Sequence, residues 1–239
     1  MKVFCYVGSN AVESSGYALM QKVKRQLEYL QVETYFYQER DINIQLCRGC
    51  GKCFQEGKCL LERQDDLTIL KQQMKRSDII LWVSPVYAVN VSGAMKNYID
   101  RLAHWLHTME LAGKCGIVIS VSSNSGLEFT SYYMKRIMES MGCYVIKEYK
   151  LRMLDKWNEQ EVVSDIVHSI QLGQEIRKQG VYTESMEESY KMLKQSFGNL
   201  EENEKSSNAY EINYWHCIKK LGLDTLKQYI EWKEKENGI

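Results

Sequence analysis

The residues with the strongest chemical signal are cysteines, because four of the eight in this 239-residue chain lie close together. Cys47, Cys50, Cys53 and Cys59 follow the spacing Cys-x2-Cys-x2-Cys-x5-Cys. Thiolates this close in sequence can converge on one inorganic centre, and the glycines between them let the backbone turn tightly. The spacing therefore indicates redox chemistry at this segment.

The overall composition excludes several classes of protein. The 31 basic and 31 acidic residues cancel, so the net charge gives no reason to expect a nucleic-acid partner. A hydrophobic content of 44% supports a buried core. The apolar run at 3–7 is too short for a signal peptide, and no stretch is long enough to span a membrane. We therefore expect a cytoplasmic protein without a membrane partner, in which clustered thiols stay reduced.

Short apolar segments rich in β-branched and aromatic residues alternate with longer segments of helical period, which is the α/β pattern. The predicted strands are 2–7, 32–37, 78–84, 115–121 and 143–149. Each is mostly apolar, as expected for strands covered on both faces. Helices are predicted between them, including one opened by the carboxylates at 65–66, one at 93–107 and a last one at 159–179.

Right-handed crossovers in such a chain give a doubly wound, five-stranded parallel sheet, with ligands at the carboxyl ends of the strands. We assign residues 1–180 to this domain. Residues 181–239 are assigned to a helical C-terminal extension that contains a flexible polar linker at 198–209. Its apolar stripe is too small to fold by itself, so we expect it to pack on the core or on a partner subunit. One hypothesis is that it covers a ligand cleft there.

The loop at 8–16 runs from the first strand directly into a helix and is rich in glycine and serine. The hydroxyls and free backbone N–H groups of this loop would lie at a helix N-terminus, which suits a phosphate. Ordinary helix capping explains the same residues equally well. Glu13 adds an adverse charge near the proposed anion.

The loop after the third strand carries the sequence Ser84-Pro85-Val86-Tyr87, with the only proline of the chain, and leads into a helix containing Lys96, Asp100 and Arg101. Small, amphipathic and rigid residues of this kind suit a planar ligand. Together with Gly8-Ser9, the cysteine quartet and Asp65-Asp66, in this order, they make the chain resemble the flavodoxin-like NAD(P)H-dependent FMN reductase family, including its iron-sulfur flavoproteins. The resemblance covers residues 1–180.

The resemblance implies a non-covalent FMN. Its phosphate would lie in the first loop, at Ser9, Ser14, Ser15 and Gly16. Its ring would lie against the second loop, and a third loop would close the other side. The residues implied in the last two loops are Pro85, Val86, Tyr87, Ala88, Val89, Asn90, Ser122, Ser123, Asn124 and Gly126. No catalytic side chain is required, because the flavin carries the hydride chemistry. The first loop departs from the family, since Asn10-Ala11 replaces the frequent Pro-Arg and Ser15-Gly16 the frequent Asn-Thr.

For the cysteine quartet, the resemblance implies a four-iron, four-sulfur cluster or free, redox-active thiols; zinc and a disulfide are the remaining alternatives. Cys5, Cys115 and Cys143 are expected to be buried apolar residues. We interpret Asp100 and Arg101 as a helix-end ion pair, and His104, His107 and Glu110 as solvated or pocket-rim groups.

Three functions remain open at this stage. The first is an FMN-dependent oxidoreductase that takes hydride from NAD(P)H and reduces a small acceptor such as a quinone, a flavin or a nitro compound, assembled as a homodimer or tetramer. The second is an iron-sulfur flavoprotein that relays electrons between protein partners. The third is a scaffold of this fold that has lost its cofactor.

Overall fold

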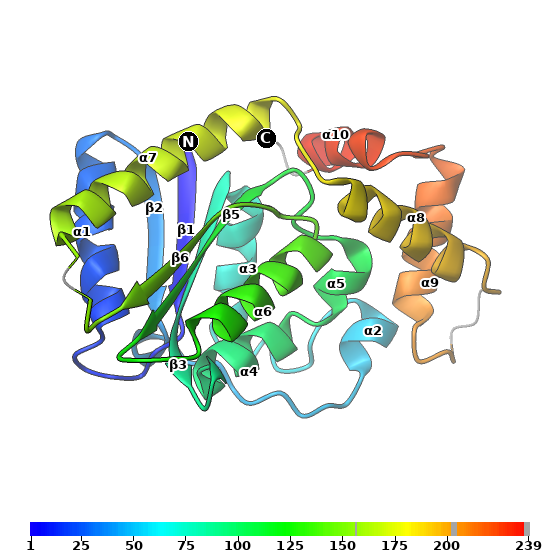
Figure 1. Ribbon diagram of the computed structural model, residues 1–239. Helices are drawn as coiled ribbons and strands as arrows, with labels where there is room; N and C mark the ends of the chain where they lie inside the picture. Colours follow the sequence, from blue (N-terminus) through cyan, green and yellow to red (C-terminus); the bar gives the residue numbers. More distant parts are fainter. Residues whose placement is uncertain (156, 202–204, 237–239) are drawn as a thin grey trace.

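The computed structural model describes residues 1–155, 157–201 and 205–236. Its centre is a parallel sheet in the order β2-β1-β3-β5-β6, shown in Figure 1. The strands are β1 (Lys2–Val7), β2 (Glu33–Gln38), β3 (Ile79–Tyr87), β5 (Cys115–Ser122) and β6 (Tyr144–Arg152), and the short β4 (Asn90–Val91) pairs antiparallel with the end of β3. This strand order confirms the expected flavodoxin-like, doubly wound sheet.

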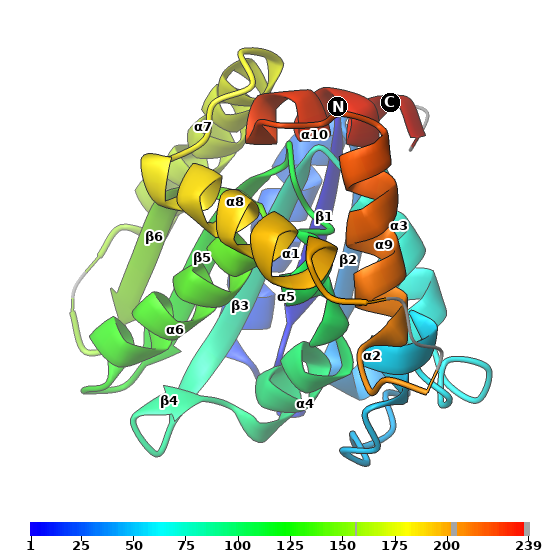
Figure 2. The ribbon, with the colours of Figure 1, turned by 90° about the vertical axis from the view of Figure 1, so that its right-hand side faces the viewer.

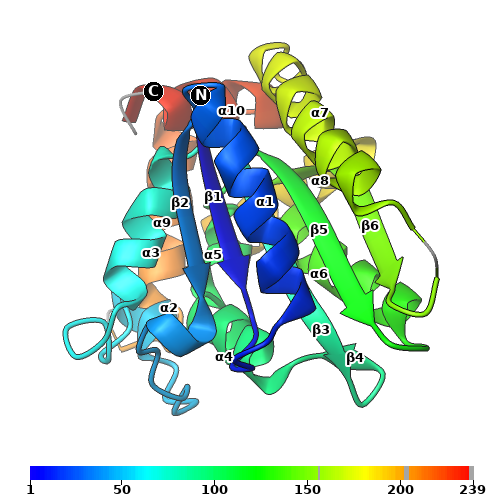
Figure 3. The same ribbon diagram turned by 90° about the vertical axis from the view of Figure 1, so that its left-hand side faces the viewer.

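Helices cover both faces of the sheet, as Figures 1 and 3 show. One face is covered by α1 (Ser15–Tyr29) and α7 (Glu159–Lys178). The other is covered by α3 (Leu67–Arg76), α4 (Gly93–Arg101), α5 (His104–Thr108) and α6 (Leu127–Ser140). Successive residues of β1 alternate between two buried apolar clusters, with Phe4 and Tyr6 in one and Val3, Cys5 and Val7 in the other. Burial on both faces explains why the strands are almost wholly apolar.

Two details of the expected elements are wrong. β3 does not end at Ser84, because the segment continues as extended backbone to Tyr87 and turns back through β4. The single helix expected at 93–107 is divided into α4 and α5. Between them the backbone bonds join residues three apart, including Trp105 N–H to Leu102 O at 2.8 Å, so the chain tightens into a 3₁₀ turn.

The start of α3 also differs from the expectation. Asp66 occupies the N-cap position, but its carboxylate does not cap α3 and instead accepts the backbone N–H of Asn43 at 2.8 Å. The backbone N–H of Leu67, the first residue of α3, donates to Asp65 at 3.2 Å. The Asp65 carboxylate therefore accepts a bond from the first residue of α3, and the Asp66 carboxylate fixes the segment that leads to the cysteines.

The C-terminal helices α8 (Glu184–Gly198), α9 (Ala209–Lys220) and α10 (Leu226–Glu236) lie together beside the core domain, as Figure 2 shows. They share an apolar cluster with Met109 and Ala112 of the core. Trp215 Nε1 donates to the carbonyl of His107 at 2.8 Å, and Lys233 pairs with Glu110 at 2.6 Å. Residues 202–204 of the expected linker lie outside the described residues.

Two short helices complete the described chain: the 3₁₀ turn η1 (Glu39–Asp41) and α2 (Lys52–Glu56), which lies within the cysteine segment. A Cβ atom on Gly57, directly after α2, would lie 2.4 Å from the ring of Tyr210 on α9. The extension therefore packs closely on the cysteine segment. Among the described residues, no helix has the length and apolar character needed to cross a membrane.

Candidate functional site

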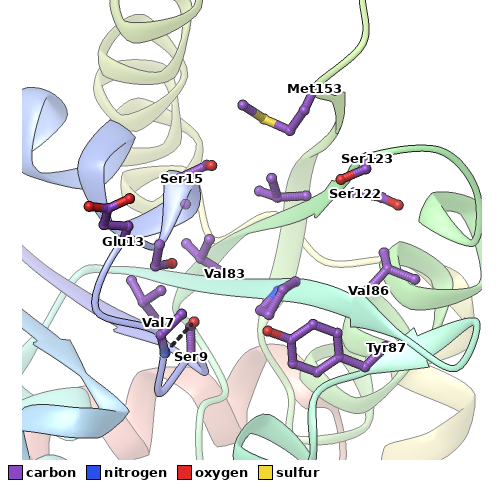
Figure 4. A pocket seen from close by; sticks show the side chains of 15 residues that line it. Val7, Ser9, Glu13, Ser15, Val83, Val86, Tyr87, Ser122, Ser123 and Met153 are labelled. Atoms are coloured by element: carbon purple, nitrogen blue, oxygen red, sulfur yellow. Dashed lines mark hydrogen bonds between the residues drawn. The ribbon is translucent and has the colours of Figure 1, made fainter.

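A hollow opens at the carboxyl ends of β1, β3 and β5, beside the N-terminus of α1. Figure 4 shows Ser9, Glu13 and Ser15 on one side of it, Ser122, Ser123 and Met153 on the other, and Val83 between them. Its lining residues are Val7, Ser9, Ala11, Glu13, Ser14, Ser15, Gly16, Val83, Pro85, Val86, Tyr87, Val121, Ser122, Ser123 and Met153. The parallel strand order predicts a ligand site at this place.

The wall formed by the first loop carries hydroxyls and helix N–H groups. Ser14 is the N-cap of α1, and its hydroxyl accepts the N–H of Tyr17 at 3.3 Å. Ser9 is buried, and its hydroxyl accepts the N–H of Ala11 at 3.3 Å. A Cβ on Gly16 would lie 3.0 Å from Val83, so glycine lets the start of α1 approach β3. The N-terminal end of the α1 dipole therefore faces the hollow.

The opposite wall is formed by the β3–β4 hairpin and the loop after β5. The tip residues Ala88 and Val89 have φ angles of +49° and +64°, a left-handed conformation that is costly for a β-branched residue. Gly126 lies beneath this tip, because a Cβ there would be 2.6 Å from Val86. The side chain of Tyr87 is half exposed at the rim.

The structure brings nine of the fourteen predicted flavin-binding residues to the hollow: Ser9, Ser14, Ser15, Gly16, Pro85, Val86, Tyr87, Ser122 and Ser123. The other five, Ala88, Val89, Asn90, Asn124 and Gly126, do not line it; they form the hairpin turn and the loop beside it. Asn90 bonds the N–H of Val91, and the N–H of Asn124 donates to Ser122. That these fourteen residues contact FMN stays a prediction.

The sequence interpretation missed several lining residues. Val7, Val83 and Val121 lie at or near the carboxyl ends of their strands, a position that could have identified them. Met153 follows β6, and its N–H donates to the carbonyl of Ser122 at 2.8 Å. No pattern in the sequence connected β6 with the hollow.

The hollow has a volume of about 180 Å³. Pockets that bury a whole drug-sized ligand have volumes of roughly 300–1,000 Å³, so a mononucleotide would extend from the hollow over its rim. The chemistry fits one: serine hydroxyls and a helix N-terminus suit a phosphate, and apolar residues with Tyr87 at the rim suit a flat aromatic ring.

A second cavity, of about 550 Å³, lies beside the end of α4. All four cysteines of the quartet line it, together with Phe54, Leu60 and Arg101 among others. The backbone N–H of Cys47 donates to Asn97 on α4 at 2.9 Å, and that of Cys59 donates to Glu62 at 3.2 Å. Side chains outside the quartet therefore fix both ends of the cysteine run.

The donor set of this cavity fits an iron-sulfur centre in its chemistry, because soft thiols gather around one space beside a buried cation. Within the described residues, no three His, Cys, Asp or Glu side chains are placed so that they could hold one metal ion together. Burial, together with the neighbouring Cys59, raises the pKa of Cys53 to about 11. Without a metal, Cys53 is therefore a neutral thiol at pH 7, unlike a reactive thiolate.

The expected ion pair between Asp100 and Arg101 is wrong. Asp100 pairs with Lys96 one turn earlier, on the exposed side of α4. Arg101 points inward and pairs with Asp65 at 2.6 Å, with both side chains fully buried. Adjacent positions on a helix point in different directions, so neighbours in sequence found separate partners.

His104 and Glu110 are buried and not solvated, and both line a cavity, which agrees with the pocket alternative of the expectation. His104 lines a third cavity, of about 200 Å³, together with Lys71, Lys75 and Tyr210. Burial, together with the neighbouring cation of Lys71, lowers the pKa of His104 to about 3. Glu110 pairs with Lys233 and Lys75, while His107 hydrogen-bonds Glu211 at 2.7 Å. These groups join the core to the extension.

Comparison with known proteins identifies the family of this chain. The family model described as NADPH-dependent FMN reductase matches residues 1–157. The chain belongs to this family. This match confirms the family resemblance drawn from the sequence.

Curated relatives carry the name iron-sulfur flavoprotein. One from Archaeoglobus fulgidus is 32% identical over 145 residues, which cover 59% of this chain and 64% of the relative. One from Methanocaldococcus jannaschii is 32% identical over 132 residues, covering 54% of this chain and 67% of the relative. The chain thus spans about two thirds of the length of these relatives.

Solved structures with the same fold are more distant in sequence. An NADH:FMN oxidoreductase superposes with a TM-score of 0.53 at 15% identity, covering 77% of this chain and 92% of that one. A flavone reductase gives 0.55 at 16% identity, covering 75% of this chain and 63% of that one. At such identities the likeness shows the fold.

Proposed function

We propose that this protein is an FMN-dependent oxidoreductase, which takes hydride from NAD(P)H and reduces a small acceptor such as a quinone, a free flavin or a nitro compound. The observation that carries the proposal is the hollow at the carboxyl ends of β1, β3 and β5, beside the N-terminus of α1. The match of residues 1–157 to the FMN reductase family supports it.

In this proposal the protein binds and orients the flavin, and the bound flavin supplies the hydride chemistry. Ser9, Ser14 and Ser15 would hold the phosphate together with the first N–H groups of α1. Pro85 and Tyr87 would contact the ring, while Ser122 and Ser123 would approach it from the other wall. The open rim leaves space for the nicotinamide to bind first and for the acceptor to bind after it at the same site.

Flavin spectroscopy tests the proposal. The purified protein is titrated with FMN, and the flavin absorbance is then followed as NADH or NADPH is added without oxygen. Binding followed by bleaching, and by recovery when a quinone or a nitro compound is added, is the expected result. Gly16→Val should weaken FMN binding because the side chain would meet Val83, whereas Gly180→Ala, with open space around it, should not. A protein that binds no FMN would contradict the proposal.

A second candidate is an electron relay between protein partners, and α4 favours it. The N-cap of α4, Ser92, donates to the carbonyl of Gly8, next to the flavin hollow. Its last residue, Arg101, lines the cysteine cavity. The nine residues of α4 rise about 13 Å, so one helix spans the two sites. The name iron-sulfur flavoprotein, carried by the relatives, points the same way.

Anaerobic purification separates the two candidates. A relay predicts a brown protein with iron and sulfide, which bleaches with a reduced protein donor and not with NADH or NADPH. The enzyme predicts bleaching with the nicotinamide. A colourless protein that cannot be reconstituted with FMN would instead support a scaffold.

We also propose a homodimer or tetramer, in the cytoplasm, with no nucleic-acid or membrane partner. The exposed apolar side chains of Tyr87, Val89, Phe129 and Tyr132, on the hairpin and the start of α6, support self-association. Sedimentation analysis at several concentrations tests this, and a monomer throughout would contradict it.

A further inference from the structure

The guanidinium of Arg101 is held in one orientation inside the protein. The residue is 1% exposed. Its Nη1 donates both to Asp65 Oδ2, at 2.6 Å, and to the carbonyl of Gln45, at 2.7 Å. The Asp65 carboxylate is fixed in turn by the backbone N–H groups of Gln45, at 3.1 Å, and Leu67, at 3.2 Å. The position of Arg101 is therefore determined by backbone atoms on two sides.

The other nitrogens of this guanidinium are not used. Nε and Nη2 are buried and have no hydrogen-bond partner among the described residues. Buried donors of a charged group are nearly always satisfied in native proteins, so these two indicate a missing acceptor. Arg101 lines the cavity that the four cysteines also line.

Sulfur is the acceptor that this cavity supplies. Its other charged lining residues are Arg48, a cation, and Asp100, which is paired with Lys96 on the exposed side of α4. The remaining acceptors among the side chains that line it are the four cysteine sulfurs.

We propose that Arg101 is a positioning residue that stabilises negative charge on the sulfurs of the cysteine quartet through N–H···S hydrogen bonds from Nε and Nη2. The proposal rests on the cysteine quartet being a metal or cluster site, and it does not depend on the flavin hollow. Hydrogen bonds and charge beside a ligating sulfur favour the more negative state of the centre. Arg101 should therefore raise both the metal affinity and the reduction potential of the quartet.

The test compares Arg101→Met with Arg101→Lys and with a matched control. Arg177 on α7 is also largely buried. It pairs with Glu234 at 3.0 Å and, at 3.3 Å, with Asp78, which directly precedes the first residue of β3. Arg177→Met therefore reproduces the loss of a buried ion pair away from the cysteines. If Arg101→Met does not fold, the double variant D65N/R101M removes the uncompensated carboxylate as well.

The first readout is Cd²⁺ affinity of the metal-free protein, measured by competition with a chelator. Because no three described donors are placed to hold one ion in the metal-free chain, Cd²⁺ binding requires the cysteine segment to close around the ion. We expect Arg101→Met to bind Cd²⁺ roughly ten- to a hundredfold more weakly, as is typical when a group behind the metal ligands is changed. Arg101→Lys should recover part of this affinity. Arg177→Met should bind Cd²⁺ like the wild type. Equal affinity in wild type and Arg101→Met, or an equal loss in Arg177→Met, would overturn the proposal. So would a wild-type protein that binds no Cd²⁺.

The second readout is the midpoint potential after reconstitution with ferrous iron and sulfide. Arg101→Met should shift it to a more negative value than in the wild type and the Arg177→Met control. An unchanged or more positive potential counts against the proposal. FMN binding, followed separately by flavin absorbance, should be equal in all variants, so a failure of the flavin proposal would be seen independently.

Discussion

Glu13 places a carboxylate on the wall of the flavin hollow, whose described lining includes no lysine or arginine. An FMN phosphate there would be held by hydroxyls and helix N–H groups against this negative charge. Two unit charges on the order of 6 Å apart in water repel by about 0.7 kcal/mol, and an FMN phosphate carries up to two.

Glu13→Gln should therefore bind FMN about three- to tenfold more tightly than the wild type, measured by fluorescence titration. The gain should shrink at high salt, because the interaction is screened. Glu175→Gln, on the exposed surface of α7, is the control. Equal affinity in Glu13→Gln and wild type would show that the carboxylate does not act on the phosphate.

His104 is a buried imidazole whose folded pKa, about 3, lies below the value of about 6.5 expected in the unfolded chain. Between these values only the unfolded state takes up the proton, so the free energy of unfolding falls as the pH falls from 6.5 toward 3. The slope is up to about 1.4 kcal/mol per pH unit.

His104→Gln should lose less stability than the wild type over this pH range, measured by urea unfolding at several pH values. The exposed His168 provides the matched variant, His168→Gln, which should follow the wild type. Parallel curves for wild type and His104→Gln would contradict the assignment of a neutral, buried imidazole.

At the scale of elements, the β3–β4 hairpin depends on a glycine of the next loop. Gly126 has φ +84°, and a Cβ there would lie 2.6 Å from Val86 and 3.1 Å from Val89. Gly180 also has a positive φ, +64°, but nothing lies within 4 Å of its Cβ position. The two sites therefore share backbone strain and differ in steric contact.

Gly126→Ala should lower the free energy of unfolding by more than Gly180→Ala, which carries only the strain of about 1–2 kcal/mol. It should also weaken FMN binding, because the hairpin that carries Pro85 and Tyr87 must move. Thermal unfolding and flavin titration measure the two effects. If both variants behave alike, the hairpin does not rest on Gly126.

The elements themselves were largely predictable from sequence. Doubly covered strands must be apolar along their length, and five such runs gave all five parallel strands to within three residues. The hairpin was missed because Pro85 marks a turn by local rules. In the structure the strand stays extended through Pro85, which pairs with Val121 of β5, and the two residues after it pair with β4. No glycine or proline marks the break between α4 and α5. The break comes directly after Arg101, whose side chain points inward and pairs with Asp65.

At the scale of the whole molecule, the extension lies over the cysteine segment and not over the flavin hollow of its own chain. None of its described residues lines that hollow, while Tyr210 packs on Gly57 next to α2. The hypothesis that it covers the flavin cleft is therefore wrong within one chain. The division at residue 180 stays a prediction.

Trp215 anchors this extension, because it is fully buried against Tyr190 and Tyr229 and bonds the carbonyl of His107. Trp215→Ala should cost about 3–5 kcal/mol of unfolding free energy and speed hydrogen exchange in α2. Trp157→Ala, at a partly exposed position after β6, should cost less and leave α2 unchanged. Equal losses in both variants would mean that Trp215 does not anchor the extension.

The sequence by itself determined the sheet, because strand periodicity and parallel order are local patterns. It also determined the family, through the resemblance that implied the nine residues found around one hollow. Only the tertiary structure decided the partners of Asp65, Arg101 and His104, the contact of Met153 with the hollow and the place of the extension. These contacts join residues that lie from 20 to more than 100 positions apart in the chain. Such pairings are set by packing in three dimensions, which local patterns do not encode.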